Sequence, residues 1–242
     1  MIEIKNGIDI SIPLRFDGSQ PKAFGVGPAT SRSLGDTRRG SSVNFDGVTF
    51  VPHCNGTHTE CVGHITNERI SVRDCLQDVI VHAVLVTIEP SSAENGDLVI
   101  TRGSLQAAIA DKSVRAPSAL ILRTLPNDDS KLSRVYDADN IPPYFASDAM
   151  KFIVECGFKH LLVDLPSIDR LYDEGRLLNH RIFWNIEPGT FETNPNTRIN
   201  STITELIYVP ESIEDGEYLL NLQIAPFESD AAPSRPILIK QA

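Results

Sequence analysis

Val79-Ile80-Val81-His82-Ala83-Val84-Leu85-Val86-Thr87-Ile88 is a long apolar run that is rich in β-branched residues. Such a run is typical of a central strand that is covered on both of its faces. Residues 119–124 and 160–164 form two further apolar runs of strand length, and each predicts another buried strand. We therefore expect a sheet whose inner strands are buried.

Helices are expected beside these strands. Ser104 is placed as the N-cap of a short helix that runs to about Asp111. Ser147 caps a clearer helix, because apolar residues follow it at helical spacing and Gly157 supplies a stop. Later strands are expected at residues 203–209, 219–224 and 236–239. This order predicts a mixed α/β fold, and the lack of a linker predicts one domain over residues 1–242.

The first fifty residues are less regular. Residues 8–14 alternate apolar and polar side chains and predict an opening strand that Pro13 ends. Residues 17–46 are rich in Gly, Ser, Asp and Pro and predict a long loop, which in a compact domain is often functional. Residues 47–51 predict a strand that leads into the next segment.

The composition argues against several kinds of partner. The chain has 242 residues, a hydrophobic fraction of 41% and a formal net charge of -10 at pH 7. This acidic balance argues against nucleic acid, because phosphate binding requires clustered Lys and Arg. No apolar run approaches the ~20 residues of a membrane-spanning helix, and residues 1–5 do not resemble a signal peptide. Since four irregularly spaced cysteines predict no disulfide framework, we expect a cytoplasmic protein with reduced thiols and no membrane partner.

Reactive side chains are concentrated between Pro52 and His64. The segment Pro52-His53-Cys54-Asn55-Gly56-Thr57-His58-Thr59-Glu60-Cys61-Val62-Gly63-His64 holds three of the six histidines, two of the four cysteines and a glutamate. Imidazole and carboxylate groups bind Zn and similar divalent ions, and histidine also transfers protons near neutral pH. An ion held with open positions makes bound water a nucleophile. The segment therefore predicts a metal or catalytic site.

The local geometry of this segment has two interpretations. Asn55-Gly56 is a strong signal for a two-residue hairpin, which would place His53 opposite His58. Glu60 and His64 then share the face of His58 by the two-residue period of a strand. If the chain instead runs straight through, Cys54 aligns with those three residues and His53 points away. Both interpretations bring His58, Glu60 and His64 together, and they differ only on whether His53 or Cys54 is the fourth member of that group.

Gly56-Thr57-His58-x-Glu60-x-x-x-His64 resembles the signature of the cyclase family, which includes bacterial kynurenine formamidase and isatin hydrolase. The family pattern is His-x-Gly-Thr-His-x-Asp-x-Pro-x-His. Residues 9–14 resemble its opening Asp-Leu-Ser-x-Pro segment, residues 120–124 its Arg-Thr strand end, and residues 162–169 its Gly-Ile-Asp-x-x-Ser-Ile-Asp segment. His180-Arg181 and Ile203-Thr204-Glu205-Leu206 resemble its distal His and Glu. The resemblance thus follows most of the chain in order.

The resemblance implies roles for these residues. His58 and Glu60 would be metal ligands, and His180 and Glu205 would hold a second ion or complete the shell. His64 would be the catalytic acid/base. Strict spacing aligns Cys54 with the first family His, whereas a one-residue insertion aligns His53, which we favour because imidazole is the family's ligand there.

The resemblance also implies features of the whole protein. These are a single β/β/α domain of the swivelling type, a divalent metal cofactor (Zn or Mn), a small-molecule substrate and a homo-oligomer with sites near subunit interfaces. This chain departs from the family pattern where Glu60 replaces Asp and Val62 replaces Pro.

Three functions are compatible with these residues. The favoured one is a metal-dependent hydrolase of an amide or related C–N bond, arylformamidase-like, in which metal-activated water attacks and His64 moves the proton. The second is a non-catalytic metal- or ligand-binding protein on the same fold, because the motif is altered at Glu60 and Val62. The third is a thiol enzyme that uses Cys54 or Cys61.

Overall fold

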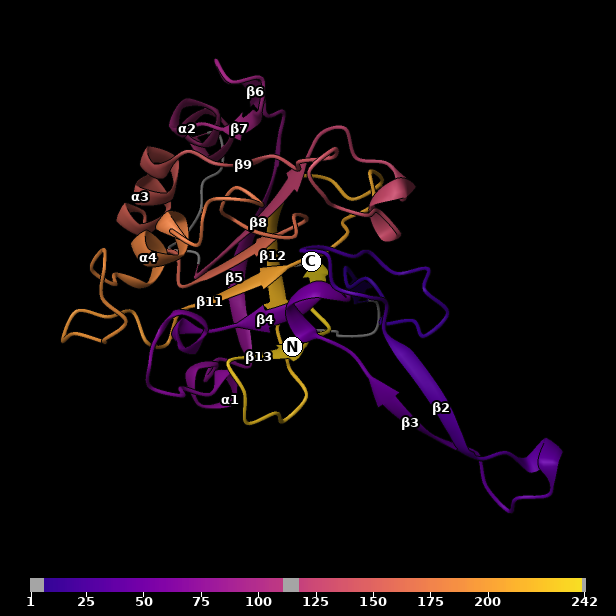
Figure 1. Cartoon of the computed structure of the whole chain (residues 1–242). Coiled ribbons are helices and arrows are strands. Elements are labelled where there is room, and N and C mark those ends of the chain that lie inside the picture. Colours follow the sequence, from indigo (N-terminus) through magenta and orange to yellow (C-terminus); the bar gives the residue numbers. More distant parts are fainter. Residues whose placement is uncertain (1–6, 111–117, 241–242) are drawn as a thin grey trace.

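The computed structural model describes residues 7–110 and 118–240, and a nine-stranded mixed sheet runs through this part of the chain (Figure 1). The strand order is β1-β14-β12-β5-β8-β10-β11-β4-β13. The strands are β1 (Ile8–Asp9), β4 (His58–Glu60), β5 (Ile80–Ile88), β8 (Ala119–Thr124), β10 (His160–Val163), β11 (Thr202–Glu205), β12 (Gly216–Asn221), β13 (Ala231–Pro233) and β14 (Ile237–Lys240). β5, β8, β10 and β11 are parallel neighbours, and the strands on both sides of them are antiparallel.

The central strand β5 is covered on both faces, as the apolar run predicted. Val84 and Val86 belong to one buried cluster, whereas Ala83 and Leu85 belong to another. Successive side chains of a strand point to opposite faces, so each face of β5 receives every second residue. The run is apolar at nearly every position because both faces meet a core.

Helices cover one face of the sheet. α2 (Arg102–Ala110), α3 (Ser147–Glu155) and α4 (Leu178–Trp184) supply buried residues to the cluster that holds Val84 and Val86 (Figure 1). On the other face, β1, β12 and β14 contribute to the second cluster. The remaining elements are shorter. They include the helix α1 (Val72–Cys75) and a small sheet of β6 (Ser91–Ser92), β7 (Leu98–Ile100) and β9 (Tyr144–Phe145). The 3-10 helices are η1 (Thr37–Arg39), η2 (Pro52–Cys54), η3 (Val62–Ile65) and η4 (Asp129–Leu132). The expected mixed α/β fold is confirmed.

The two expected helices are present, but both start earlier than predicted. Ser147 was expected to be the N-cap of α3 and is instead its first residue, because Ala146 holds the N-cap position. Gly157 follows the end of α3 with a φ of 81°. α2 begins at Arg102, so the prediction that Ser104 is its N-cap was wrong. The backbone N–H of Ser104 donates to Thr101 Oγ1, and the Thr101 N–H donates to Ser104 Oγ, each at 3.2 Å. This reciprocal pair caps the helix from Thr101, while the expected end at Asp111 lies outside the described residues.

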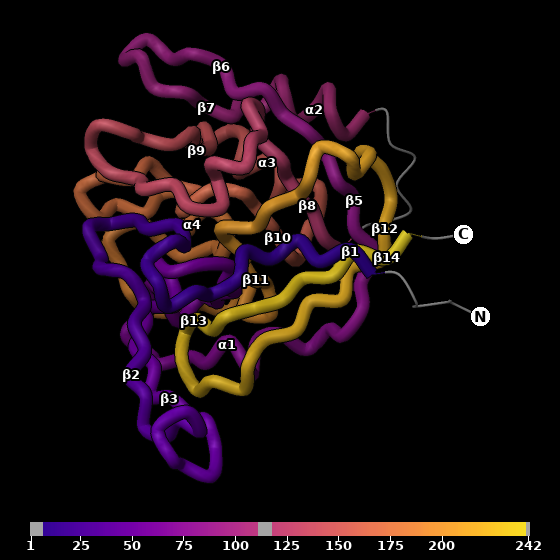
Figure 2. Tube along the Cα trace, turned by 90° about the vertical axis from the view of Figure 1, so that its right-hand side faces the viewer, coloured from indigo at the N-terminus to yellow at the C-terminus, as the bar shows by residue number. Residues whose placement is uncertain are grey.

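The N-terminal region differs most from its prediction. The expected loop over residues 17–46 contains β2 (Thr30–Gly35), which pairs antiparallel with β3 (Phe45–Thr49) to form an arm that projects from the body (Figure 2). The opening strand is short, because the chain leaves β14 after Asp9 and Ser11 bridges to Ile207 instead. The signal-peptide prediction concerns residues outside the described ranges. Within those ranges, no helix is both long and apolar enough to cross a membrane.

His160 leads to a prediction about stability and pH. It lies at the start of β10 with 1% of its surface exposed, and its ring nitrogens contact Thr202 Oγ1 at 2.8 Å and Asp78 Oδ2 at 3.1 Å. Burial lowers its pKa, despite the opposing hydrogen bond and charge of Asp78. The unfolded chain takes up this proton near pH ~6.5, whereas the folded chain resists it, so stability is lost as the pH falls below that value.

We expect the contribution of His160 to the free energy of unfolding to decrease between pH 7 and pH 5. His160→Gln lacks this contribution, so its free energy of unfolding should fall less, or rise more, than that of the wild type over this range, with slopes that differ by up to one proton. Urea unfolding of both proteins at the two pH values measures the effect. Equal slopes in the wild type and the variant would contradict it.

Candidate metal centre

Two adjacent strands place the first three candidate ligands on one face of the sheet. β4 pairs antiparallel with β11, with His58 opposite Glu205 and Glu60 opposite Ile203. Since His58 and Glu60 are two residues apart, they share the face that carries Glu205. α4 packs on the same face and brings His180, followed one turn later by the buried Trp184. His180 therefore reaches Glu60 from a segment 120 residues away.

The hairpin predicted at Asn55-Gly56 is wrong. Residues Pro52–Cys54 form the 3-10 helix η2, and the N–H groups of Cys54 and Asn55 both donate to the Val51 carbonyl. The Asn55 side chain accepts from the Val51 N–H at 2.8 Å and closes this turn. β4 pairs with β11 and β13 instead of the preceding segment, because its ladder is completed by distant strands. His53 nevertheless reaches the cluster by way of the turn.

The straight-strand interpretation also fails beyond Glu60. β4 ends there, and His64 lies in the 3-10 helix η3, whose His64 N–H donates to the Cys61 carbonyl. A Cβ atom on Gly63 would lie 2.1 Å from the Ile70 carbonyl oxygen, so only glycine permits this close approach. His64 thus returns to the cluster through a tight turn instead of strand alternation.

The side chains converge on Glu60 and Glu205 at distances between 3.0 and 3.9 Å. Glu60 Oε2 lies 3.0 Å from His53 Nδ1 and 3.9 Å from His64 Nε2, and Glu60 Oε1 lies 3.1 Å from His180 Nε2. Glu205 Oε2 lies 3.4 Å from His58 Nε2, and its Oε1 lies 3.9 Å from His180 Nε2. All five metal ligands expected from the sequence therefore meet, together with His64.

Each imidazole has one nitrogen held by an acceptor outside the centre. Gly56 O lies 3.0 Å from Nδ1 of His58, and Asp169 Oδ2 lies 2.6 Å from Nδ1 of His180. Asp230 Oδ2 lies 2.9 Å from Nε2 of His53 and 3.3 Å from Nδ1 of His64. The other nitrogen of every ring is directed toward Glu60 or Glu205. Metal-binding histidines have this arrangement, because the outer acceptor selects the tautomer and orients the ring.

The donor set fits a divalent cation. His58 Nε2 is fully buried and has no hydrogen-bond partner, so a lone pair is directed into the centre without a proton donor to satisfy it. His53, His58 and Glu60 offer ligand atoms within 4.8 Å of one another, and so do Glu60, His64 and His180. Two carboxylates and several imidazoles with open positions suit Zn and similar ions.

The electrostatics of the cluster favour positive charge. Burial opposes charge on Glu60, but the His64 charge and hydrogen bonds from His180 and His53 hold its pKa well below the usual value. Burial and the charge of Glu60 raise the pKa of Glu205. Burial alone would lower the pKa of His53, yet hydrogen bonds to Asp230 and Glu60 raise it to about 10. The carboxylates thus stabilise a cation between them, either a proton or a metal ion.

Two members of this network were missed by sequence reasoning. Asp169 ends the segment of residues 162–169 that resembles the family, but it was given no role there; it accepts from His180, as well as from the backbone N–H of Asn179. Asp230 was not considered, because it lies 166 residues after His64 and no local pattern marks it. An aspartate just before a short strand carries no signal until that strand is known to pair with β4.

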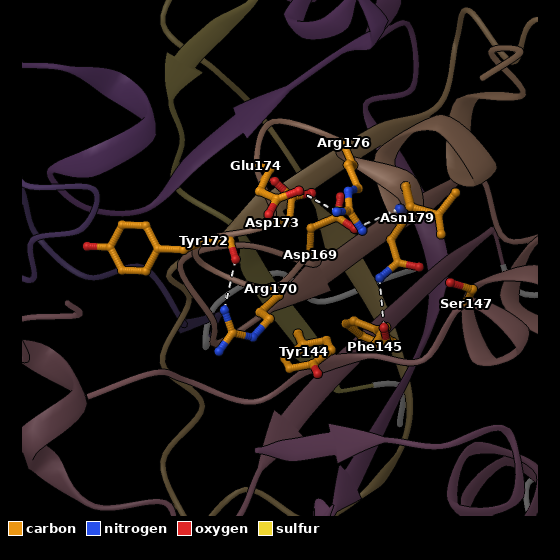
Figure 3. Close-up of a pocket in the computed structure, with 11 residues that line it drawn as sticks. Tyr144, Phe145, Ser147, Asp169, Arg170, Tyr172, Asp173, Glu174, Arg176 and Asn179 are labelled. Atoms are coloured by element: carbon orange, nitrogen blue, oxygen red, sulfur yellow. Dashed lines mark hydrogen bonds and ion pairs between the residues drawn. The ribbon is translucent and has the colours of Figure 1, made fainter. Parts of the chain in front are cut away.

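Asp169 also borders a pocket of about 290 Å³, which none of the cluster histidines lines (Figure 3). Beside it, the Asn179 side-chain amide donates to the carbonyls of Phe145 and Ile168 at 2.7 and 3.0 Å. These bonds fasten the start of α4 to the body of the protein. The pocket wall therefore supports the helix that carries His180.

The thiols are poorly suited to nucleophilic chemistry. Burial, followed by the charge of Glu205, raises the pKa of Cys54 to about 11. Contact with Cys75 and burial raise the pKa of Cys61, which is fully buried. The reactive form of cysteine is the thiolate, so both groups are inert near neutral pH.

Comparison with known proteins identifies the family. The model of the family named Cyclase, described as "Putative cyclase", matches residues 8–170. The chain belongs to the cyclase family. A kynurenine formamidase of Bacillus cereus is 27% identical over 237 residues, which cover 96% of each chain. The resemblance seen in the motif is thereby confirmed.

Solved structures of cyclase-like proteins share the fold. Isatin hydrolase A from Labrenzia aggregata superposes with a TM-score of 0.70 at 14% identity, over 98% of this chain and 94% of its own. A "predicted metal-dependent hydrolase" from Bacillus stearothermophilus superposes with a TM-score of 0.65 at 14% identity, over 98% of each chain. At this level of identity the likeness concerns the fold.

Proposed function

We propose that this protein is a metal-dependent hydrolase of an amide or related C–N bond. The observation that carries the proposal is the set of four imidazoles, each held by an outer acceptor and each turned toward Glu60 or Glu205. The activities named for the relatives, kynurenine formamidase and isatin hydrolase, support a small aromatic substrate with an amide bond. An arylformamide is the simplest member of that class.

The proposed ligands are His53, His58, Glu60, His180 and Glu205, with Zn or Mn as the ion. When bound, a divalent ion supplies a Lewis acid that makes water acidic near neutral pH and polarises a carbonyl group. Glu60 lies between three of the imidazoles, so it would contact both ions if two were bound.

His64 is proposed as the general acid/base. Its side chain is 27% exposed, whereas Glu60 and His180 are almost fully buried, so His64 stands at the open side of the cluster. Nδ1 is occupied by Asp230, which leaves Nε2 to take a proton from water and to deliver it to the leaving nitrogen. Asp230, which contacts His64, also lines a pocket of about 240 Å³ together with residues 69–71 and 228–229, and we propose this pocket as the place of the substrate.

Two finer expectations remain part of this proposal, namely a cytoplasmic location and a homo-oligomer. The β2–β3 arm carries exposed apolar side chains, among them Leu34, Phe45 and Val48. These side chains support the homo-oligomer, because a second copy of the chain could cover them.

Removal of the metal tests the function. Dialysis against a chelator is expected to abolish hydrolysis of an N-formylated aromatic amine, and added Zn²⁺ or Mn²⁺ is expected to restore it. Elemental analysis before and after dialysis shows whether an ion left the protein. Hydrolysis that persists in protein shown to be free of metal would refute the proposal.

A further inference from the structure

We propose that Asp230 is a positioning residue that orients His53 and His64 together, so that one carboxylate sets both a metal ligand and the acid/base. The inference rests on the proposed function for the roles of the two histidines. Its geometric basis is that Asp230 Oδ2 lies 2.9 Å from His53 Nε2 and 3.3 Å from His64 Nδ1. The two rings lie side by side, with centroids 4.3 Å apart.

Asp230 is itself held on three sides. Its carbonyl accepts from the Cys61 N–H at 3.0 Å, directly after Glu60, and its Oδ1 accepts from Ser229 Oγ at 3.0 Å. The next residue, Ala231, pairs with Glu60 in the sheet. The carboxylate therefore has a set position relative to Glu60, and its second oxygen is left for the histidines.

The carboxylate decides which nitrogen of each ring carries the outer proton. An ionised carboxylate only accepts, so His53 Nε2–H and His64 Nδ1–H are the donors. This leaves His53 Nδ1 and His64 Nε2 facing Glu60, at 3.0 and 3.9 Å. The rings of His58 and His180 are set in the same way, but each by an acceptor of its own. Among these outer acceptors, Asp230 is the one that serves two rings.

The shared acceptor matters most for His53, which faces Glu60 through Nδ1, whereas His58, His64 and His180 face the carboxylates through Nε2. A free imidazole beside a carboxylate can present either nitrogen. With Nε2 held by Asp230, His53 presents only Nδ1 to the centre. His53 and His64 are also the partly exposed rings, at 22% and 27%, so packing alone restrains them least.

Asp230→Asn and Asp230→Ala test the assignment, with Asp215→Asn as the matched control. Asp215 is a carboxylate of similar exposure, 25% against 21%, and it binds Thr87 and Arg123 far from the cluster in the sheet. Zn²⁺ affinity is measured by competition with a chelating dye, and stoichiometry by elemental analysis. Nitrogen-15 spectra of the histidine rings in Zn²⁺-loaded protein report which nitrogen of each ring keeps its proton.

Loss of an outer hydrogen-bond partner typically costs about 10–100-fold in metal affinity or activity. We expect a loss in this range for Asp230→Ala, a smaller one for Asp230→Asn, which keeps an acceptor oxygen, and none for Asp215→Asn. The number of ions bound is expected to stay the same, kcat to fall more than KM changes, and the ring signals of His53 and His64 to show mixed tautomers.

Two results would overturn the inference. Unchanged affinity and unchanged ring spectra in folded Asp230→Asn would show that Asp230 positions neither histidine. Loss of one ion from the stoichiometry would make Asp230 a metal ligand, since His53, His64 and Asp230 also offer atoms within 4.8 Å of one another. A wild type without amide hydrolysis would refute the proposed function alone, because the ring spectra of Zn²⁺-loaded protein test Asp230 without any turnover.

Discussion

Replacing His64 by Ala is expected to lower kcat for an N-formylated aromatic amine by about 10²–10⁴-fold, the usual contribution of a general acid/base. The metal content is expected to remain unchanged, because the other three rings and the carboxylates of Glu60 and Glu205 stay in place. KM is expected to change little, since His64 acts on a proton that moves during the reaction. Steady-state kinetics with elemental analysis of the same samples measures both quantities.

Added imidazole sharpens this experiment. His64 is 27% exposed at the open side of the cluster, so a small base from solution can reach the space that His64→Ala leaves. Partial recovery of kcat with imidazole is expected for this variant and not for the wild type. His82→Gln, an exposed position on β5, is the control and should keep full activity. If His64→Ala instead loses metal in proportion to activity, His64 is a ligand and its assigned role is wrong.

Replacing Glu60 by Gln is expected to remove metal binding and activity together. Glu60 contacts His53, His64 and His180 and is 1% exposed, so no water replaces its charge. Gln keeps the shape but not the negative charge that stabilises a cation in the buried centre. The loss should exceed the about 10–100-fold that follows removal of an outer hydrogen-bond partner.

Thermal unfolding gives a measurement of Glu60 that does not depend on activity. A ligand that binds only the folded chain stabilises it according to its concentration and affinity. Added Zn²⁺ should therefore raise the Tm of the wild type and of Glu60→Asp, which keeps the carboxylate, but not that of Glu60→Gln. Glu217→Gln, at an exposed position on β12, should respond like the wild type. A full Zn²⁺-dependent rise in the Tm of Glu60→Gln would exclude Glu60 from the metal site.

The central strands could be predicted from local sequence because their environment is uniform. Residues 79–88 and 119–124 are apolar at most positions, and the structure places β5 and β8 there with both faces covered. The arm was predicted only in part, because β3 overlaps the strand expected at residues 47–51, whereas β2 lies in the expected loop. Its strands are polar, mostly exposed and without a core face, so their sequence lacks the alternation by which a half-buried strand is recognised.

The candidate centre was predicted in its members but not in its geometry. His58 and Glu60 share a strand face as expected, yet His53 and His64 arrive through 3-10 turns that the hairpin and straight-strand interpretations both missed. The close approach of Gly63 to Ile70 is a contact between turns, and no pattern in residues 52–64 reveals it. Local propensity at Asn55-Gly56 was overridden because β4 completes its hydrogen bonds with β11 and β13.

The sequence by itself determined the class of fold, the family and the chemical character of the site, since apolar runs and clustered His and Glu are local properties of the chain. Tertiary structure alone decided which nitrogen of each ring faces the centre. That choice depends on Asp169 and Asp230, whose carboxylates come from the loop after β10 and the loop before β13. The hydrogen bonds of Asp230 join residues more than a hundred positions apart, so they follow from strand order and register, which exist only once the sheet has formed.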